Sequence, residues 1–194
     1  MARTSPLDGA IVEDRLREIR EVYLSDSRPW VIGYSGGKDS TCALQLVWTA
    51  LLGLPAEQRT KPVYVITSDT LVETPVIVRY IDVTLARIAA AAAEQGLPIK
   101  TEKVTPNVDR SFWVNLIGRG YPAPSRRFRW CTERLKIEPA NDFIKARVAE
   151  FGEVVMVLGV RSSESATRAQ VMSFHRIKGS VLSRHSSLQN AFVY

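Results

Sequence analysis

The chain has 194 residues and a formal net charge of +6, and 45% of its residues are hydrophobic against 24% charged, which is the composition of an ordinary soluble globular protein. No apolar run reaches the ~20 residues that span a membrane, and the first residues lack an apolar signal core. We therefore expect a cytoplasmic protein that needs no membrane. Two cysteines, Cys42 and Cys131, are too few for a disulfide framework.

The spacing of apolar residues predicts helices and strands that alternate along most of the chain. Pro29 bounds a short apolar run that ends in a Ser-Gly-Gly loop, and Pro75 suits the first turn of a long helix. The expected elements, in chain order, are a helix at 8–25, a strand at 30–34, a helix at 38–52, a strand at 63–66, a helix at 74–95, an edge strand at 99–104, a helix that Pro139 opens and a strand at 154–158.

This alternation predicts an α/β fold with a parallel sheet flanked by helices. Ligands of such sheets bind outside the carboxyl ends of the strands, where polar loops follow Tyr34, Ile66 and Leu158. We expect an N-terminal helix within residues 1–28 and one domain over residues 29–194. Because the chain ends in apolar residues without a stop signal, we expect that domain to be truncated at its C-terminal end.

Positive charge is concentrated in two windows of the sequence. Residues 110–136 contain seven basic residues and one acid, and residues 161–184 contain five basic residues and one acid. Aromatic residues are interspersed in the first window, and this combination suits a phosphate-bearing partner, either a nucleotide or a nucleic-acid backbone. The alternative is a solvated basic face beside aromatic residues of the core.

The segment Ser35-Gly36-Gly37-Lys38-Asp39-Ser40 joins the first expected strand to the following helix. Two glycines let the backbone turn sharply and approach an anion, and the amides at the start of the helix then point toward that anion. Lys38 adds a positive charge, and the two serines add hydroxyl groups. The pattern is not GxxxxGK[ST], because Asp39 follows Lys38 and Ile32 stands in place of the first glycine. The segment predicts a phosphate-binding loop.

This loop after an apolar strand resembles the PP-loop of the ATP pyrophosphatases, which cleave ATP between the α- and β-phosphates. Residues 158–165 resemble the GxRxxES motif of phosphoadenosine phosphosulfate reductases, a branch of the same superfamily. Residues 68–75 and the stretches FWVNLIGRGYPAP and FRWCTERLK extend the likeness to DndC-type proteins, the sulfurtransferases of DNA phosphorothioation. The resemblance runs from about Trp30 to Tyr194.

The resemblance implies a Rossmann-like fold of the adenine nucleotide alpha hydrolase (HUP) type and a DNA-modifying enzyme of a restriction-modification or defence system. DndC-type proteins replace a non-bridging phosphate oxygen of DNA with sulfur, and the implied cofactors are ATP and Mg²⁺. The implied partners are DNA, a cysteine desulfurase that supplies the sulfur, and the other proteins of the DNA phosphorothioation complex.

The resemblance also implies roles for individual residues. Residues 35–40 are expected to bind the β- and γ-phosphates, with Asp39 capping its helix or reaching Mg²⁺. Ser68 and Asp69 are expected to face the adenosine or the metal, and an ordinary turn before a helix is the alternative. Gly159 is expected to allow close approach to the nucleotide, and Arg161 to contact the α-phosphate or the DNA phosphate and stabilise the transition state. The expected catalytic residues are Lys38, Asp39 and Arg161, and the expected nucleotide-binding residues are Ser35, Gly36, Gly37, Lys38, Asp39, Ser40, Ser68, Asp69, Gly159 and Arg161.

The family also holds a [4Fe-4S] cluster with four cysteines, and only Cys131 matches a ligand position in this sequence. We therefore expect no complete cluster in this chain alone. Cys42, on the helix after the loop, is expected to be a small core residue. Arg126, Arg127 and Arg129 are the expected contacts to DNA.

Two other functions stay open. One is a phosphoadenosine phosphosulfate reductase or a sulfate adenylyltransferase-like enzyme of sulfur assimilation, against which Leu71 replaces the glycine of the usual aspartate-threonine-glycine. The other is a catalytically idle module that binds a nucleotide or DNA. Release of pyrophosphate from ATP separates an enzyme from an idle module, and stimulation of that release by DNA separates the two kinds of enzyme.

Overall fold

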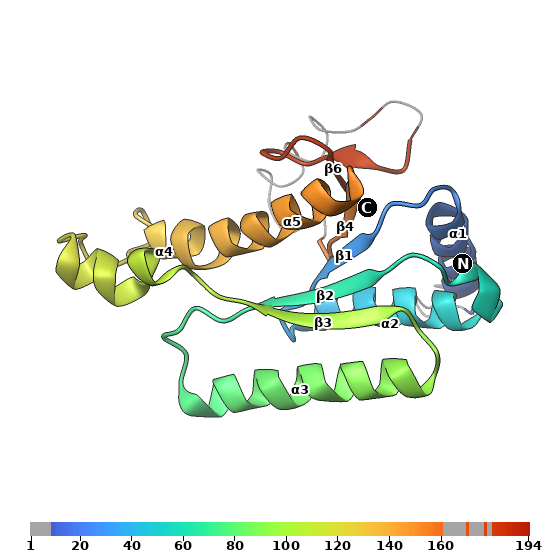
Figure 1. Cartoon of the computed structure of the whole chain (residues 1–194), viewed down its shortest axis with the longest axis horizontal. Helices are drawn as coiled ribbons and strands as arrows, with labels where there is room; N and C mark the ends of the chain where they lie inside the picture. Colours follow the sequence, from blue (N-terminus) through green and yellow to red (C-terminus); the bar gives the residue numbers. More distant parts are fainter. Residues whose placement is uncertain (1–8, 161–169, 171–176, 178–179) are drawn as a thin grey trace, which may run out of the picture.

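The computed structural model describes residues 9–160, 170, 177 and 180–194. Six strands within these residues form one sheet, in the order β3-β2-β1-β4-β6-β5 (Figure 1). Neighbouring strands run parallel, except that β5 is antiparallel to β6 at one edge. The strands are β1 (Trp30–Gly33), β2 (Val63–Ser68), β3 (Ile99–Val104), β4 (Val154–Val157), β5 (Ser183–Arg184) and β6 (Ala191–Val193).

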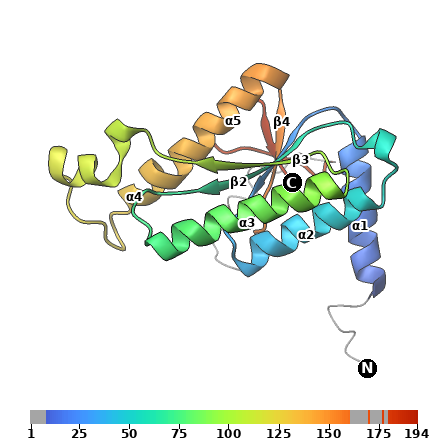
Figure 2. The same ribbon diagram turned by 60° about the horizontal axis from the view of Figure 1, so that its bottom comes forward.

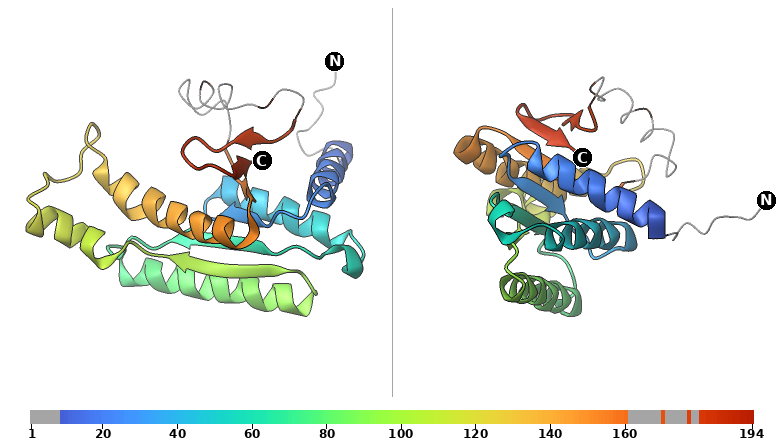
Figure 3. Two further views of the ribbon diagram at one scale, coloured as in Figure 1. Left: turned by 45° about the horizontal axis from the view of Figure 1, so that its top comes forward. Right: turned by 90° about the vertical axis from the view of Figure 1, so that its right-hand side faces the viewer.

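Helices cover both faces of this sheet. Helix α5 lies on one face, and α2 and α3 lie side by side on the other, with α1 packed against α2 (Figures 1, 2 and 3). The helices are α1 (Gly9–Leu24), α2 (Lys38–Leu52), α3 (Pro75–Glu94), the short α4 (Trp130–Thr132) and α5 (Glu138–Phe151). Shorter turns are the 3₁₀ segments η1 (Ala56–Gln58) and η2 (Val108–Arg110) and the π-helical segments η3 (Val114–Gly118) and η4 (Glu133–Ile137).

The alternation of side chains along β1 divides the core into two layers. Trp30 and Ile32 pack with residues of α1 and α2, whereas Val31 packs with Ile144 of α5 on the opposite face. Because the side-chain period of a strand is two, a shift of one residue would exchange the two layers. Each buried aliphatic side chain contributes about 1.5–3 kcal/mol, so the register and the point where each strand ends are strongly specified.

The predicted parallel sheet flanked by helices is confirmed, and the architecture is Rossmann-like. Strand β3 lies at an edge of the sheet, as its polar alternation predicts. β2 runs two residues beyond the expected end, because Thr67 and Ser68 continue to pair with Lys103 and Val104. β5 and β6 were not predicted, since strands of two and three residues show no alternation.

Between β3 and α5 the chain leaves the sheet. Residues 105–137, here called the extension, project beyond the carboxyl ends of β2 and β3 (Figures 1 and 2). The interior of the extension is aromatic: Phe112 stacks on Trp130 with 5.4 Å between ring centroids, and Tyr121 meets Trp130 edge-on at 5.5 Å. The first basic window of the sequence therefore lies on a projection at the carboxyl ends of the strands, where ligands of such sheets bind.

A buried ion pair lies just before the amino ends of β1 and β2. The side chain of Lys61 is 4% exposed, and its Nζ lies 3.0 Å from Asp26 Oδ1 and 4.6 Å from the ring centre of Tyr23. Burial lowers the pKa of Lys61, and the contact with Asp26 offsets this only in part. Burial alone would raise the pKa of Asp26, but hydrogen bonds from Arg28 and Lys61 outweigh it and lower that pKa. The pair ties the segment before β1 to the segment before β2.

Candidate nucleotide-binding site

The predicted phosphate-binding loop lies between the carboxyl end of β1 and the start of α2. Gly36 has a φ of 71°, a left-handed conformation that residues with a side chain seldom adopt. Gly37 is the N-cap of α2, and its position supplies no side-chain cap. The first-turn amides and the positive end of the helix dipole are therefore available to an anion, as a phosphate-binding loop requires.

Two serine hydroxyl groups hold the loop in this shape. Ser40 Oγ donates to the carbonyl oxygen of Gly37 at 3.1 Å and accepts the amide of Ser35 at 3.2 Å. Ser35 Oγ lies 3.1 Å from Ser40 Oγ, so the two side chains close the turn. Ser40 is buried, and its hydroxyl supports the loop from within. Direct contact of either serine with phosphate stays a prediction.

Lys38 and Asp39 lie next to each other at the mouth of the loop. Lys38 Nζ is 2.9 Å from Asp39 Oδ2, and the Lys38 side chain is 74% exposed. An ion pair this exposed contributes only about 0–1 kcal/mol to stability. The fold therefore does not depend on this pair, and the long Lys38 side chain can reach a bound phosphate.

The loop and the segment after β4 form the two walls of one cavity of about 460 Å³, which lies within the usual size range of ligand pockets. Gly159 comes so close to α2 that a Cβ atom on it would lie 2.5 Å from the carbonyl oxygen of Asp39. The structure thus brings Gly159 together with the predicted loop. The lining residues are Gly33, Ser35, Gly37, Lys38, Asp39, Ser40, Leu158, Gly159 and Val160.

Asp69 belongs to the turn between β2 and α3. It is 3% exposed, its Oδ1 accepts the amide of Leu71 at 2.9 Å, and its Oδ2 lies 3.4 Å from Lys103 Nζ. Lys103 also donates to Asp82 at 2.8 Å, and this contact above all raises the pKa of Lys103. These contacts are those of an ordinary turn before a helix. That Asp69 and the half-buried Ser68 contact the adenosine or a metal stays a prediction.

Leu71 occupies the position where the resemblance expects glycine. Its φ is 61°, in the left-handed region that favours glycine, and its side chain is 51% exposed. Asp69 accepts its amide, and Thr70 Oγ1 donates to Glu73 at 2.9 Å, so the neighbouring residues hold this conformation. The turn therefore keeps the backbone shape of a glycine turn without the glycine.

Sequence reasoning missed Tyr80, which lies beside the loop. This residue of α3 is 59% exposed, and a Cβ atom on Gly36 would lie 3.9 Å from its Cε1 atom. An aromatic ring with a hydroxyl group thus stands next to the phosphate-binding loop. The sequence carries no signal of this contact, because it joins α3 to a loop that precedes α2.

The predicted nucleic-acid residues lie on the extension. Arg126, Arg127 and Arg129 are exposed, and within the described residues no acidic side chain pairs with them. Arg110 and Arg134 differ, because both bind Glu138, at 2.9 Å and 3.1 Å. The extension and the phosphate-binding loop lie at the same end of the sheet (Figure 1). The arginines therefore form a positive surface on the same side as the cavity.

The two cysteines lie on different helices. Cys131 is half-buried on α4, whereas Cys42 is exposed on α2. The expectation that Cys42 is a core residue is wrong, because α2 buries Leu44, Val47 and Leu51 and turns Cys42 to the solvent. Two thiolates cannot supply the four ligands of a [4Fe-4S] cluster. In the described parts of the chain, no group of three or more His, Cys, Asp or Glu side chains is arranged to hold a metal ion.

Arg161 lies outside the described residues, so its role stays a prediction. The segment that leads to it, Leu158 to Val160, lines the cavity beside Lys38 and Asp39. Across the ranges that the structure describes, no helix is both long enough and apolar enough to cross a membrane.

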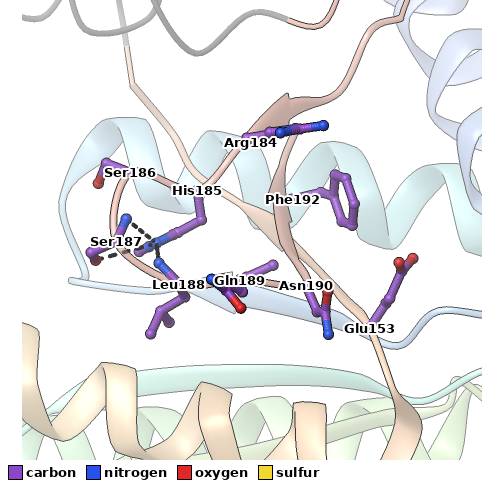
Figure 4. Close-up of a pocket in the computed structure, with 10 residues that line it drawn as sticks. Glu153, Arg184, His185, Ser186, Ser187, Leu188, Gln189, Asn190 and Phe192 are labelled. Carbon is purple, nitrogen blue, oxygen red and sulfur yellow. Dashed lines mark hydrogen bonds between the residues drawn. The ribbon is translucent and has the colours of Figure 1, made fainter.

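A second cavity, of about 620 Å³, lies at the amino ends of β4 and β6, on the side of the sheet away from the loop (Figure 4). His185 Nδ1 accepts the amides of Ser187 and Leu188 at 3.2 Å and 3.1 Å, which folds the turn between β5 and β6. The Arg28 guanidinium covers the Phe192 ring at 4.6 Å. Arg184 lines this cavity, but none of its lining residues is a glycine or begins a helix, so it lacks the glycine turn and the helix start of the first cavity.

Comparisons with known proteins give a family match over most of the chain. The sequence profile of the phosphoadenosine phosphosulfate reductase domain matches residues 29–181. An uncharacterized protein of Methanocaldococcus jannaschii is 28% identical over 158 residues, which are 81% of this chain. The chain spans only 28% of the length of that relative.

Two solved structures are similar to this chain at low sequence identity. One is a phosphoadenylyl-sulfate reductase from Candida auris in a phosphate complex, with 17% identity, a TM-score of 0.49 and coverage of 99% of this chain and 79% of that chain. The other is a U34-tRNA thiolase from Methanococcus maripaludis with its [4Fe-4S] cluster, with 15% identity, a TM-score of 0.48 and coverage of 90% and 52%.

Proposed function

This chain belongs to the phosphoadenosine phosphosulfate reductase domain family, and from that premise we propose that it is an ATP-dependent enzyme of DNA phosphorothioation. In the proposed reaction ATP is cleaved to AMP and pyrophosphate, and the AMP activates a phosphate of the DNA backbone for the insertion of sulfur. The proposal concerns the protein to which this domain contributes, with DNA as the substrate.

The observation that carries the proposal is the form of the loop before α2. Gly36 turns in the left-handed region, Gly37 leaves the helix without a side-chain cap, and Lys38 lies at the mouth of the cavity. Backbone amides, a helix dipole and a lysine each favour a bound phosphate, and here all three occur at one loop. The triphosphate of ATP is the ligand proposed for this arrangement.

In the proposed chemistry, the phosphate-binding loop stabilises the leaving group, pyrophosphate. An oxygen of a DNA phosphate attacks the α-phosphorus, the bond from that phosphorus to the bridging oxygen breaks, and pyrophosphate leaves with the electron pair. The amides of Lys38 and Asp39 and the Lys38 ammonium group are proposed to stabilise the charge that develops on pyrophosphate. Arg161 is proposed to contact the α-phosphate from the segment after β4.

The loop offers one residue, Asp39, that could bind Mg²⁺. Carboxylate oxygen is the ligand that Mg²⁺ prefers, and the Asp39 carboxylate lines the cavity beside the proposed phosphate site. A bound Mg²⁺ would neutralise part of the triphosphate charge. The [4Fe-4S] cluster does not fit this chain alone, since Cys131 and Cys42 are its only thiols; Cys131 is proposed as one ligand in a larger assembly that includes a cysteine desulfurase.

DNA is proposed as the acceptor because of the extension. Three exposed arginines, Arg126, Arg127 and Arg129, belong to the extension, which lies at the same end of the sheet as the phosphate-binding loop. Guanidinium groups that have no acidic partner among the described residues are suited to backbone phosphates, which they can contact without entering the nucleotide cavity. A sulfate ion that reacts in the cavity would be too small to contact these arginines on the extension.

The test is pyrophosphate release from ATP and Mg²⁺, measured without DNA, with duplex DNA and with single-stranded DNA. We expect release that rises when DNA is added and that disappears in Lys38→Ala. Binding of ATP without any release, with or without DNA, would contradict the enzyme and favour an idle nucleotide-binding module. Release that DNA does not change would contradict DNA as the acceptor.

The family itself favours a second candidate, the reduction of phosphoadenosine phosphosulfate by a dithiol. Leu71 has a φ of 61°, a conformation that glycine adopts readily, so a leucine at this position does not exclude a turn that other members build with glycine. Sulfite release from phosphoadenosine phosphosulfate in the presence of a reduced dithiol protein measures this activity. Sulfite production without pyrophosphate release from ATP would establish the second candidate over the first.

A further inference from the structure

The extension exposes large aromatic side chains beside its arginines. Trp113 is 57% exposed and Phe128 is 45% exposed, whereas Trp130 of the same segment is buried at 7%. Other aromatic rings of the extension do pack together, because Phe112 and Tyr121 both contact Trp130. Trp113 and Phe128 are therefore exposed aromatic surface on a projection that also carries exposed arginines and the exposed aliphatic residues Val108 and Ile117.

The ring of Trp113 packs against the ring of Phe112. It meets Phe112 edge-on, with 5.1 Å between ring centroids and 89° between ring planes. Phe112 in turn stacks on Trp130, whose Nε1 donates to the carbonyl oxygen of Pro122 at 3.0 Å. A ring fixed in this way loses little conformational entropy when a planar ligand stacks on it.

The backbone of Phe128 is held in a tight turn. The amide of Ser125 donates to the carbonyl oxygen of Phe128 at 3.1 Å, and the amide of Phe128 donates back to Ser125 at 3.2 Å. This reciprocal pair closes a tight turn that has Arg126 and Arg127 at its tip. The turn thus presents two guanidinium groups and one aromatic ring together.

The positive charge of this turn is not neutralised locally. The two arginines at the tip and Arg129 have no acidic partner within the described residues, in contrast to Arg110 and Arg134, which share Glu138. The partner that complements the surface therefore carries repeated negative charge and exposed planar groups.

We infer that the extension binds a single-stranded or unpaired segment of nucleic acid, with bases stacked on Trp113 and Phe128 and phosphates bound by Arg126, Arg127 and Arg129. The bases of a duplex are covered on both faces by their neighbours, so they cannot stack on an exposed ring. An unpaired base has a free face, and stacking on aromatic side chains is how proteins bind single strands without reading their sequence. The inference rests on the proposed function only in taking nucleic acid as the partner.

The experiment compares three labelled ligands of one sequence by fluorescence anisotropy: a single-stranded DNA of about 12 nucleotides, the same DNA annealed to its complement, and the matching single-stranded RNA. We expect the DNA single strand to bind roughly tenfold or more tightly than the duplex. Trp113→Ala and Phe128→Ala should each weaken single-strand binding by roughly tenfold and leave duplex binding nearly unchanged.

Two further variants separate stacking from loss of structure. Trp113→Phe keeps a flat ring and should retain most of the single-strand affinity. Phe151→Ala removes an aromatic residue of similar exposure at the end of α5, away from the extension, and should not change binding. Circular dichroism of all four variants checks that each is folded.

Duplex binding as tight as single-strand binding, or unchanged affinity in Trp113→Ala, would overturn the inference. RNA bound more tightly than DNA would support the stacking surface and contradict DNA as the acceptor in the proposed function. Because no step of this experiment uses ATP, loss of pyrophosphate release and loss of single-strand binding are separate results.

Discussion

Gly159 and Asp39 are in backbone contact: a Cβ atom on Gly159 would lie 2.5 Å from the carbonyl oxygen of Asp39 and 2.9 Å from the amide nitrogen of Ser40. The segment after β4 therefore lies directly against the first turn of α2. This contact sets the distance between the two walls of the cavity, and only a residue without a side chain allows it.

Gly159→Ala should displace the first turn of α2, because the atoms that the new methyl group meets belong to the backbone and cannot rotate away. We expect a loss of about 1–3 kcal/mol in the free energy of unfolding and a clear loss of ATP affinity. Urea denaturation and ATP titration by calorimetry measure the two effects. Gly9→Ala is the control, because nothing lies within 4 Å of a Cβ atom there; equal behaviour of the two variants would contradict the packing argument.

Lys38→Ala should abolish ATP turnover and leave the fold intact. The Lys38 side chain is 74% exposed and its pair with Asp39 contributes little to stability. The substitution should therefore weaken contacts with the bound nucleotide and not the fold. We expect a decrease in pyrophosphate release of roughly 100-fold or more, and the same for Asp39→Ala. Lys145→Ala removes an exposed lysine that pairs with Asp142 on α5 and should keep the parent rate. If Lys38→Ala kept the parent rate, the proposed role of the loop in ATP turnover would be wrong.

The arginines of the extension should act through phosphate contacts. Replacing Arg126, Arg127 and Arg129 with alanine should lower the slope of log affinity against log salt by about two to three, since each phosphate contact contributes ~0.7 in single strands and ~0.9 in duplex DNA. ATP affinity should stay the same. The control replaces Arg17, Arg79 and Lys145, which are exposed elsewhere, and so changes the net charge equally. If both triple variants gave the same slope, total charge and not this surface would determine binding.

Removing one partner of the Lys61–Asp26 ion pair should destabilise the fold strongly. Asp26→Asn leaves the buried ammonium group of Lys61 without its partner, and we expect a loss of about 3–5 kcal/mol in the free energy of unfolding. Asp14→Asn removes an exposed pair with Arg17 on α1 and should cost at most about 1 kcal/mol. Adding Lys61→Met to Asp26→Asn should recover part of the loss, because the unpaired charge is then gone. Urea denaturation at pH 7 measures all three.

The same pair predicts a dependence of stability on pH. The pKa of Asp26 is lowered in the folded protein, so its contribution is complete above the ordinary value of 3.8 and is lost as the pH falls through the folded pKa. The pKa of Lys61 is also lowered, so stability rises with pH between that folded pKa and 10.5. Asp26→Asn should therefore lose less stability than the parent between pH 4 and pH 2. An identical acid dependence of the two proteins would contradict this assignment.

Local sequence determined the elements and the loop. The apolar run at 30–34, the glycines that follow and the helical spacing from Lys38 were sufficient for β1, the phosphate-binding loop and α2, because each depends on interactions between near neighbours in the chain. Alternation of strands and helices was sufficient for the parallel sheet, since a parallel connection needs a helical crossover. The family resemblance was likewise readable from short motifs of fixed spacing.

Contacts between distant segments could be decided only by the tertiary structure. Helical spacing already places Cys42 opposite Leu44, Val47 and Leu51, so its exposure could be predicted. It does not show that Asp69 is held by Lys103, or that Tyr80 stands beside Gly36. The strands β5 and β6 are too short for a periodic signal; β6 pairs with the edge of β4 that β1 leaves open, and β5 pairs with β6. The sequence also marked Gly159 as a place of close approach, but only the folded chain shows that the Asp39 backbone comes that close. Such contacts depend on how the elements pack, and packing is a property of the whole core that no local pattern encodes.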